Sequence, residues 1–134
     1  MKYKAFGAFA ALMGLFVAAA PALAHHAFQA EYDETKIITL KGTLTKIDWI
    51  NPHIYFYLDV KDASGNMQHW TLGTTAPGAY RNAGLTKSMW TLGDTYTVTA
   101  AAAKDKTNLA HVKDWFFPDG HKVTVWFGDP NDAR

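Results

Sequence analysis

The fold of this chain is decided by residues 41–62, KGTLTKIDWINPHIYFYLDVKD, which read as two β-strands meeting at a corner. Asn51 and Pro52 mark the corner, and the second strand follows His53. Apolar and polar side chains then alternate with a period of two, which predicts one face packed on a core and one directed away from it. The side chains expected in the core are Ile54, Phe56, Leu58 and Val60. The opposite face carries His53, Tyr55 and Tyr57 in a row.

The preceding strand, residues 37–49, changes face partway along its length. Its apolar residues of one parity are Ile38, Leu40 and Leu44, and those of the other parity are Ile47 and Trp49. A change of parity near residues 45–46 predicts a β-bulge, which bends a strand. Gly42 within the strand fits the same sharp curvature. A long, bent first strand of this kind can serve both sheets of a small barrel.

The rest of the chain supplies the elements needed to close such a barrel. In chain order, we expect a turn at 63–66, a strand at 67–74, a short helix at 76–83, a helical turn at 86–90, a strand around 96–100, and a hairpin of strands at 109–117 and 121–127. Thr75 is the expected N-cap of the helix, Pro77 lies in its first turn and Gly84 ends it. The core predicted from the alternation is Ile54, Phe56, Leu58, Trp70, Leu72 and Val98.

This element order predicts a mainly β fold: a five- to six-stranded OB-like barrel with one short helix between strands three and four. A small β-sandwich is the alternative, because strand order is not readable from one sequence. The expected organisation is an extended N-terminal arm at 25–35, the barrel at 36–127 and a loose tail at 128–134. About 110 residues suffice for one domain with a single core.

Residues 1–24 have the pattern of a cleaved signal peptide. Lys2 and Lys4 give a positive start, residues 5–20 form an apolar run, and cleavage is expected between Ala24 and His25. A retained membrane anchor is the rival interpretation, but the run is shorter than the ~20 residues of a spanning helix. The chain has no cysteine, so disulfides are excluded and an exported domain must be held by its core.

Removal of the leader changes the charge balance. Two of the 13 basic residues lie in it, which leaves 13 − 2 = 11 against 12 acidic residues, a net charge of −1 with histidines neutral. A slightly acidic exported domain has no general attraction for phosphate backbones, so nucleic acid is not an expected partner.

Several motifs of the chain resemble those of a known protein family. They are HHAF at 25–28, EYD at 31–33, KGTLTKIDWINPH at 41–53, LDVKDASG at 58–65 and LGDTYTV at 92–98. The chain resembles a family of short exported proteobacterial proteins classed as a domain of unknown function. The resemblance covers nearly all of the sequence after the leader. It implies a periplasmic, OB-like single domain and no established activity.

The sequence offers little support for catalysis. There is no cysteine, and Ser64 and Ser88 stand in turn-like settings without a nucleophile elbow. The sequence has no glycine-rich motif of the kind that binds nucleotides. Glu31, Asp33 and Asp59 are expected to be solvated carboxylates. We therefore expect a binding or accessory module rather than an enzyme.

The sharpest functional hypothesis is a copper or zinc site. His25 at a free N-terminus would offer its α-amine and its ring nitrogen together; His26 is adjacent, and His53 could supply a third nitrogen. Such nitrogen ligands favour Cu(II) over Zn(II). The structural alternative is a solvated His-His end and a histidine that merely follows an Asn-Pro corner.

The other histidines are expected to lie outside this metal site. His69 should face Asp59 across the hairpin, ~20 Å along the strand from His53 at ~3.3 Å per residue. His111 and His121 flank the last hairpin and are expected to face solvent.

The alternative function uses the outward aromatic face. Tyr55 and Tyr57 could bind a carbohydrate or another protein, as OB-type barrels do on the face around strands two and three. Alternatively, the arm could cover both tyrosines, with Phe28 and Tyr32 as its packing anchors. The expected partner is a periplasmic protein or a small ligand.

Overall fold

The computed structural model describes residues 28–125. A turn of helix at 28–31 precedes six strands and two short helices. In chain order they are β1 (Tyr32–Trp49), β2 (Ile54–Lys61), β3 (Met67–Gly73), α2 (Pro77–Asn82), a 3-10 helix (Lys87–Met89), β4 (Thr95–Ala103), β5 (Leu109–Phe116) and β6 (Lys122–Thr124).

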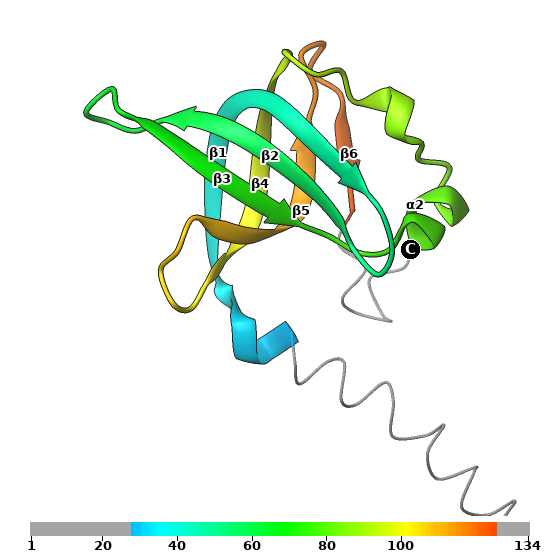
Figure 1. Cartoon of the computed structure of the whole chain (residues 1–134), viewed down its shortest axis with the longest axis horizontal. Coiled ribbons are helices and arrows are strands. Elements are labelled where there is room, and N and C mark those ends of the chain that lie inside the picture. The colour runs from blue at the N-terminus through cyan, green and yellow to red at the C-terminus, as the bar shows by residue number, and fades with distance from the viewer. Residues whose placement is uncertain (1–27, 126–134) are drawn as a thin grey trace, which may run out of the picture. The chain divides into compact units, whose positions relative to one another are not determined.

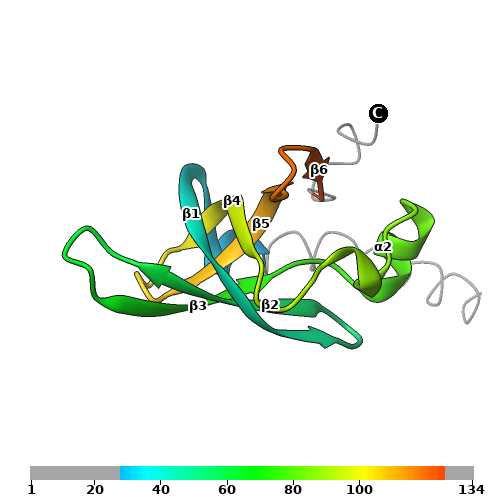
Figure 2. The same ribbon diagram turned by 90° about the horizontal axis from the view of Figure 1, so that it is seen from above.

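The six strands form one sheet that closes on itself. Their order is β3-β2-β1-β4-β5-β6, and an additional pairing joins β3 to β5. This seam is parallel and short, with Thr71, Leu72 and Gly73 opposite Leu109, Ala110 and His111. Figures 1 and 2 show the strands curling round to this closure, with α2 beyond one end. The OB-like barrel is confirmed, with its helices between β3 and β4 as predicted.

The bend in β1 arises from a β-bulge and from Gly42, as the sequence indicated. The strand pairs with β2 through Gly42–Trp49 and with β4 through Tyr32–Thr43, so it serves both sides of the barrel. Its register against β2 shifts between Leu44 and Lys46, which confirms the predicted bulge. Gly42 lies where the two pairings overlap, and an added Cβ there would be 2.6 Å from the carbonyl oxygen of Asp59.

The first strand begins at Tyr32, five residues before the predicted Ile37. An irregularity in the pairing with β4 lies between Asp33 and Ile37. There the Asp33 carboxylate accepts hydrogen bonds from the amide and hydroxyl of Thr35. This local loop interrupts the alternation, which is why the strand was predicted to begin only at Ile37. Residues 25–27 of that arm and the predicted tail at 128–134 lie outside the described residues.

The core is built around aromatic rings. Phe56 has no exposed surface, and its ring centroid lies 4.7 Å from that of Trp115 and 5.3 Å from that of Trp90. Of the predicted core, the side chains confirmed as buried are Ile54, Phe56, Leu58, Leu72 and Val98. Trp70 is only half-buried. It precedes the seam by one residue, so it has a neighbouring strand on one side alone.

The connection between β3 and β4 differs from the prediction at its N-cap. Ala76, rather than Thr75, is the N-cap of α2, and no side chain caps the helix. The amide of Thr75 instead donates to the hydroxyl of Thr74. Gly84 ends the helical segment with a φ of 76°. Among residues 28–125, no helix is long and apolar enough to cross a membrane.

Candidate functional site

Two histidines and two tyrosines meet at the seam between β3 and β5, around Gly73. We call this group the imidazole corner; its residues are Tyr32, His53, Tyr55, Gly73 and His111. They come from β1, β2, β3, β5 and the turn before β2. Closure of the barrel, rather than proximity in the sequence, brings these elements together.

His53 is fixed by the hydrogen bonds that follow the Asn51–Pro52 corner. Its Nδ1 lies 3.1 Å from the carbonyl oxygen of Thr74. Because a carbonyl only accepts, Nδ1 carries the proton and the lone pair of the neutral ring is on Nε2. Backbone bonds from Ile54 to Thr75 and from Thr74 to Ile54 hold the same junction. His53 is exposed, and its ring centroid is 6.4 Å from that of Tyr55.

His111 lies against the seam and is half-buried. In β5 it is opposite Gly73 on one side and Ala101 on the other, and its ring centroid is 5.4 Å from that of Tyr32. Burial, together with the neighbouring His53, lowers the pKa of His111 to about 4, so the ring is neutral at neutral pH. His111 was expected to face solvent and is only partly exposed, because the parallel pairing of β3 with β5 was not foreseen.

Gly73 allows the two tyrosines to approach the seam. It lies between Tyr55 and His111 in the strand register. A Cβ at this position would be 3.3 Å from the hydroxyl of Tyr32 and 3.5 Å from Cε1 of Tyr55. Both phenol rings thus reach the outer side of a strand that has no side chain of its own here. Tyr32, which the sequence placed in the arm, does lie beside Tyr55.

Tyr57 belongs to a different group of side chains. Its hydroxyl donates to the Asp48 carboxylate at 2.9 Å, and the ammonium of Lys46 lies 4.8 Å from its ring centroid. Lys46 also pairs with Asp48 at 2.8 Å. Burial, and then the bond to Asp48, raises the pKa of Tyr57. Tyr55 and Tyr57 therefore do not form one uniform aromatic face, because Tyr57 is engaged by charged neighbours.

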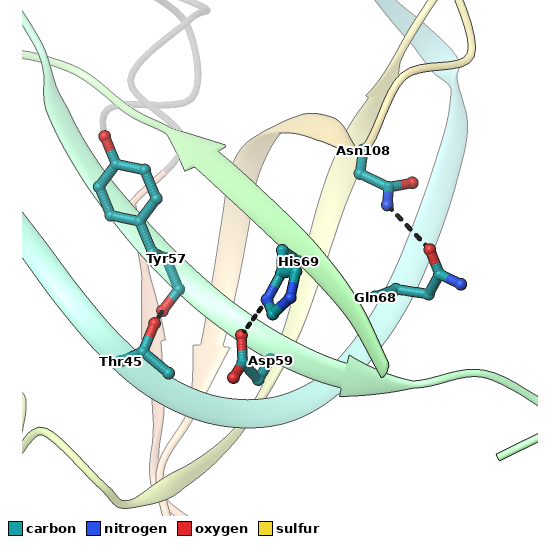
Figure 3. Close-up of polar contacts among 6 residues, drawn as sticks. All are labelled: Thr45, Tyr57, Asp59, Gln68, His69 and Asn108. Carbon is teal, nitrogen blue, oxygen red and sulfur yellow. Dashed lines mark hydrogen bonds and ion pairs between the residues drawn. The ribbon is translucent and has the colours of Figure 1, made fainter. Parts of the chain in front are cut away.

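The remaining described histidines have acidic partners. His69 faces Asp59 in the register of the β2–β3 hairpin, which confirms that prediction, and its Nδ1 is 2.6 Å from the carboxylate (Figure 3). His121 pairs with Asp119 and stacks on Phe117 with ring centroids 4.2 Å apart. His25 and His26 lie outside the described residues. Within residues 28–125, no three His, Cys, Asp or Glu side chains gather closely enough to hold a metal ion.

One signal in the sequence could have pointed to His111. Residues 100–103 are four consecutive alanines, and all four are buried in β4. A strand in which both faces carry only small buried residues must have close neighbours on each side. Ala101 is directly opposite His111. The alanine run therefore marks the part of the barrel where the adjacent His111 is half-buried.

Comparison with known proteins gives a family but no activity. The sequence model of one family, described as a family of unknown function (DUF6152), matches residues 12–111. The matched part includes both histidines of the imidazole corner. No curated protein matches the chain.

Proposed function

The chain belongs to this family of unknown function, and we propose that it is a small exported binding protein that holds Cu(II), or Zn(II), at the imidazole corner. The observation that carries the proposal is the convergence of His53 and His111 across the barrel seam. These residues are far apart in the sequence, yet His53 is bonded to the carbonyl of Thr74, and Thr74 directly follows Gly73, which lies opposite His111.

The chemistry of the corner suits a metal that prefers nitrogen ligands. His53 directs its proton-bearing Nδ1 to Thr74, which leaves Nε2 as the ligating nitrogen. A backbone carbonyl that fixes the ring and tautomer in this way is the usual outer partner of a metal-binding histidine. Imidazole ligands suit copper and zinc, and the general affinity order places Cu(II) above Zn(II).

The other ligands are proposed from the sequence. Cleavage after Ala24 would expose His25, whose α-amine and ring nitrogen can bind one ion together, with His26 beside it. Two imidazoles from the barrel and two nitrogens from His25 would complete a four-coordinate nitrogen site. This proposal places the mature protein in the periplasm. It acts there as an accessory or binding module, not as an enzyme.

The carbohydrate or protein-binding alternative has less support. It relied on Tyr55 and Tyr57 as one outward face, and Tyr57 is held by Asp48 and Lys46. Tyr55 remains next to His53. A sugar that stabilises the protein without any bound metal would favour this alternative.

Calorimetric titration of Cu(II) into correctly processed protein tests the proposal. The protein is produced by export, and intact mass establishes that it starts at His25. We expect His53→Ala and His111→Asn each to weaken binding about ten-fold or more, because each removes a nitrogen ligand. His69→Ala is the matched control and should bind like the parent, since His69 of β3 is paired with Asp59 of β2.

One extra residue before His25 tests the N-terminal ligands separately. It converts the amine of His25 into an amide and should also weaken binding. If the His53 and His69 variants bind equally, or if the parent binds no tighter than about micromolar (roughly −8 kcal/mol), the metal function is refuted.

A further inference from the structure

The β2–β3 hairpin has an unpaired edge outside the imidazole corner. Strand β3 pairs with β2 over its full length, Met67–Gly73, but with β5 only through Thr71–Gly73. The amide of Thr71 donates to the carbonyl of Asn108 at 2.9 Å, at the start of the seam. Figure 1 shows the hairpin reaching past the other strands. Among the described residues, only β2 pairs with residues 67–70.

The alternation of an antiparallel strand identifies the backbone groups at this edge. The amide of Thr71 points away from β2, toward Asn108. By the same alternation, the N–H and C=O groups of His69 and Met67 also point away from β2, whereas those of Gln68 and Trp70 bond to it. Natural proteins commonly protect such an edge with lysine or proline. Residues 67–70, MQHW, have neither, and Met67 is 46% exposed.

We propose that this edge pairs with the same edge of a second copy of the chain, antiparallel, about a two-fold axis at Gln68. In this register Met67 faces the partner's His69, and His69 faces the partner's Met67. Each of these pairs exchanges two N–H···O=C bonds, so all the outward backbone groups of both residues are satisfied. The proposal is independent of metal binding.

The neighbouring registers are less favourable because their backbone groups are already used. A two-fold axis at His69 would need the amide of Thr71, which is bonded to Asn108. A shift toward the turn, to an axis at Met67, would place His69 opposite the partner's Gly65, whose amide donates to the carbonyl of Asp62. The unpaired part of the β3 edge is therefore as long as the stretch that pairing about Gln68 uses.

The side chains at the edge leave room for this pairing. Figure 3 shows His69 directed to Asp59, on the neighbouring strand of its own hairpin, and Gln68 linked to Asn108 at 3.2 Å. The imidazole of His69 thus has its counterion within its own chain. Met67 of one copy would lie beside the imidazole of the partner's His69, a favourable contact between a thioether and an aromatic ring.

Cysteine cross-linking tests the register directly, since the chain has no cysteine of its own. A two-fold axis at Gln68 makes the two copies of this residue a non-hydrogen-bonded pair, with Cα atoms about 4.5 Å apart. This separation is within the roughly 4.4–6.8 Å that a disulfide spans. Gln68→Cys should form a covalent dimer at least about ten-fold faster than Ser64→Cys at the exposed turn, because association raises the effective thiol concentration. Equal rates would overturn the proposal.

Sedimentation with EDTA present separates strand pairing from metal bridging. The parent and His69→Ala, which keeps the backbone amide, should both dimerise as concentration rises. His69→Pro removes one outward amide and should remain monomeric while keeping the circular dichroism spectrum of the parent. A parent that stays monomeric at millimolar concentration would contradict the proposal, as would a dimeric proline variant. The cross-linking result decides the matter if the proline variant does not fold.

Discussion

Replacing Gly42 with alanine should destabilise the barrel where β1 passes from β2 to β4. The new methyl would lie 2.6 Å from the Asp59 carbonyl oxygen and 2.7 Å from Cγ2 of Val60. Val60 can rotate, but the Asp59 oxygen belongs to the backbone of β2 and moves only with the strand. Forcing an extra carbon into a packed site typically costs about 1–3 kcal/mol.

An opposing effect must be subtracted from this cost. Alanine restricts the unfolded chain, which favours folding by about 0.4–1 kcal/mol where the backbone conformation suits it. Gly42 does not have a positive φ, so this gain applies. The steric cost is larger, and we expect a net loss of about 1–2 kcal/mol in the free energy of unfolding.

Urea denaturation followed by tryptophan fluorescence measures this loss. The melting temperature should fall by about 4–8 °C for each kcal/mol of stability lost in a domain of this size. Gly78→Ala is the matched control: the nearest atom to its new methyl is an Arg81 nitrogen at 3.9 Å. Because Gly78 lies in α2, that variant should gain up to about 1 kcal/mol. If Gly42→Ala is as stable as the parent, the proposed close approach of β1 and β2 is wrong.

Two further variants test the core and the response to acid. Phe56→Ala should lower the free energy of unfolding by about 3–5 kcal/mol, since the ring is fully buried among Trp90 and Trp115; a melt within a few degrees of the parent would place Phe56 on the wrong face. Burial raises the pKa of Asp114, but hydrogen bonds from Thr124 and Thr99 outweigh it and hold the pKa below 3.8. The folded state therefore gains stability from this carboxylate above pH 3.8 and loses it as pH falls through the folded pKa. Asp114→Asn should be less stable than the parent at neutral pH. Its urea midpoint should also fall less steeply than that of the parent as the pH is lowered. If the two midpoints fall equally steeply, the loss of stability in acid belongs to other groups.

The parts of the fold that sequence predicts well are those set by neighbouring residues. The alternation from Ile54 to Val60 identified the buried face of β2, and the parity change identified the bulge after Leu44. The turn at 63–66 fixed the hairpin register, including the pairing of His69 with Asp59. These features depend on periods and turn chemistry, which a single sequence carries directly.

The candidate site was only partly predictable because it is assembled by a long-range pairing. His53 was identified from the corner that precedes it, but His111 was assigned to solvent. Its environment depends on β3 lying beside β5, and no local pattern specifies strand order. Tyr32 was likewise placed in an arm, since the loop between Asp33 and Ile37 interrupts the alternation of β1. The sequence therefore identified one side of the corner and missed the side supplied by β5.

The short parallel seam has a consequence for how ligand binding relates to the integrity of the barrel. Only three residue pairs join β3 to β5, whereas the β2–β3 pairing extends over seven. His53 is bonded to the β3 side of the seam, and His111 belongs to β5. An ion held by both histidines would link β3 to β5 across the shortest strand pairing in the closed ring of the barrel. Separation of β3 from β5 would move His53 and His111 apart. Binding of an ion would therefore stabilise the closed barrel, and the closed barrel would bind the ion more tightly.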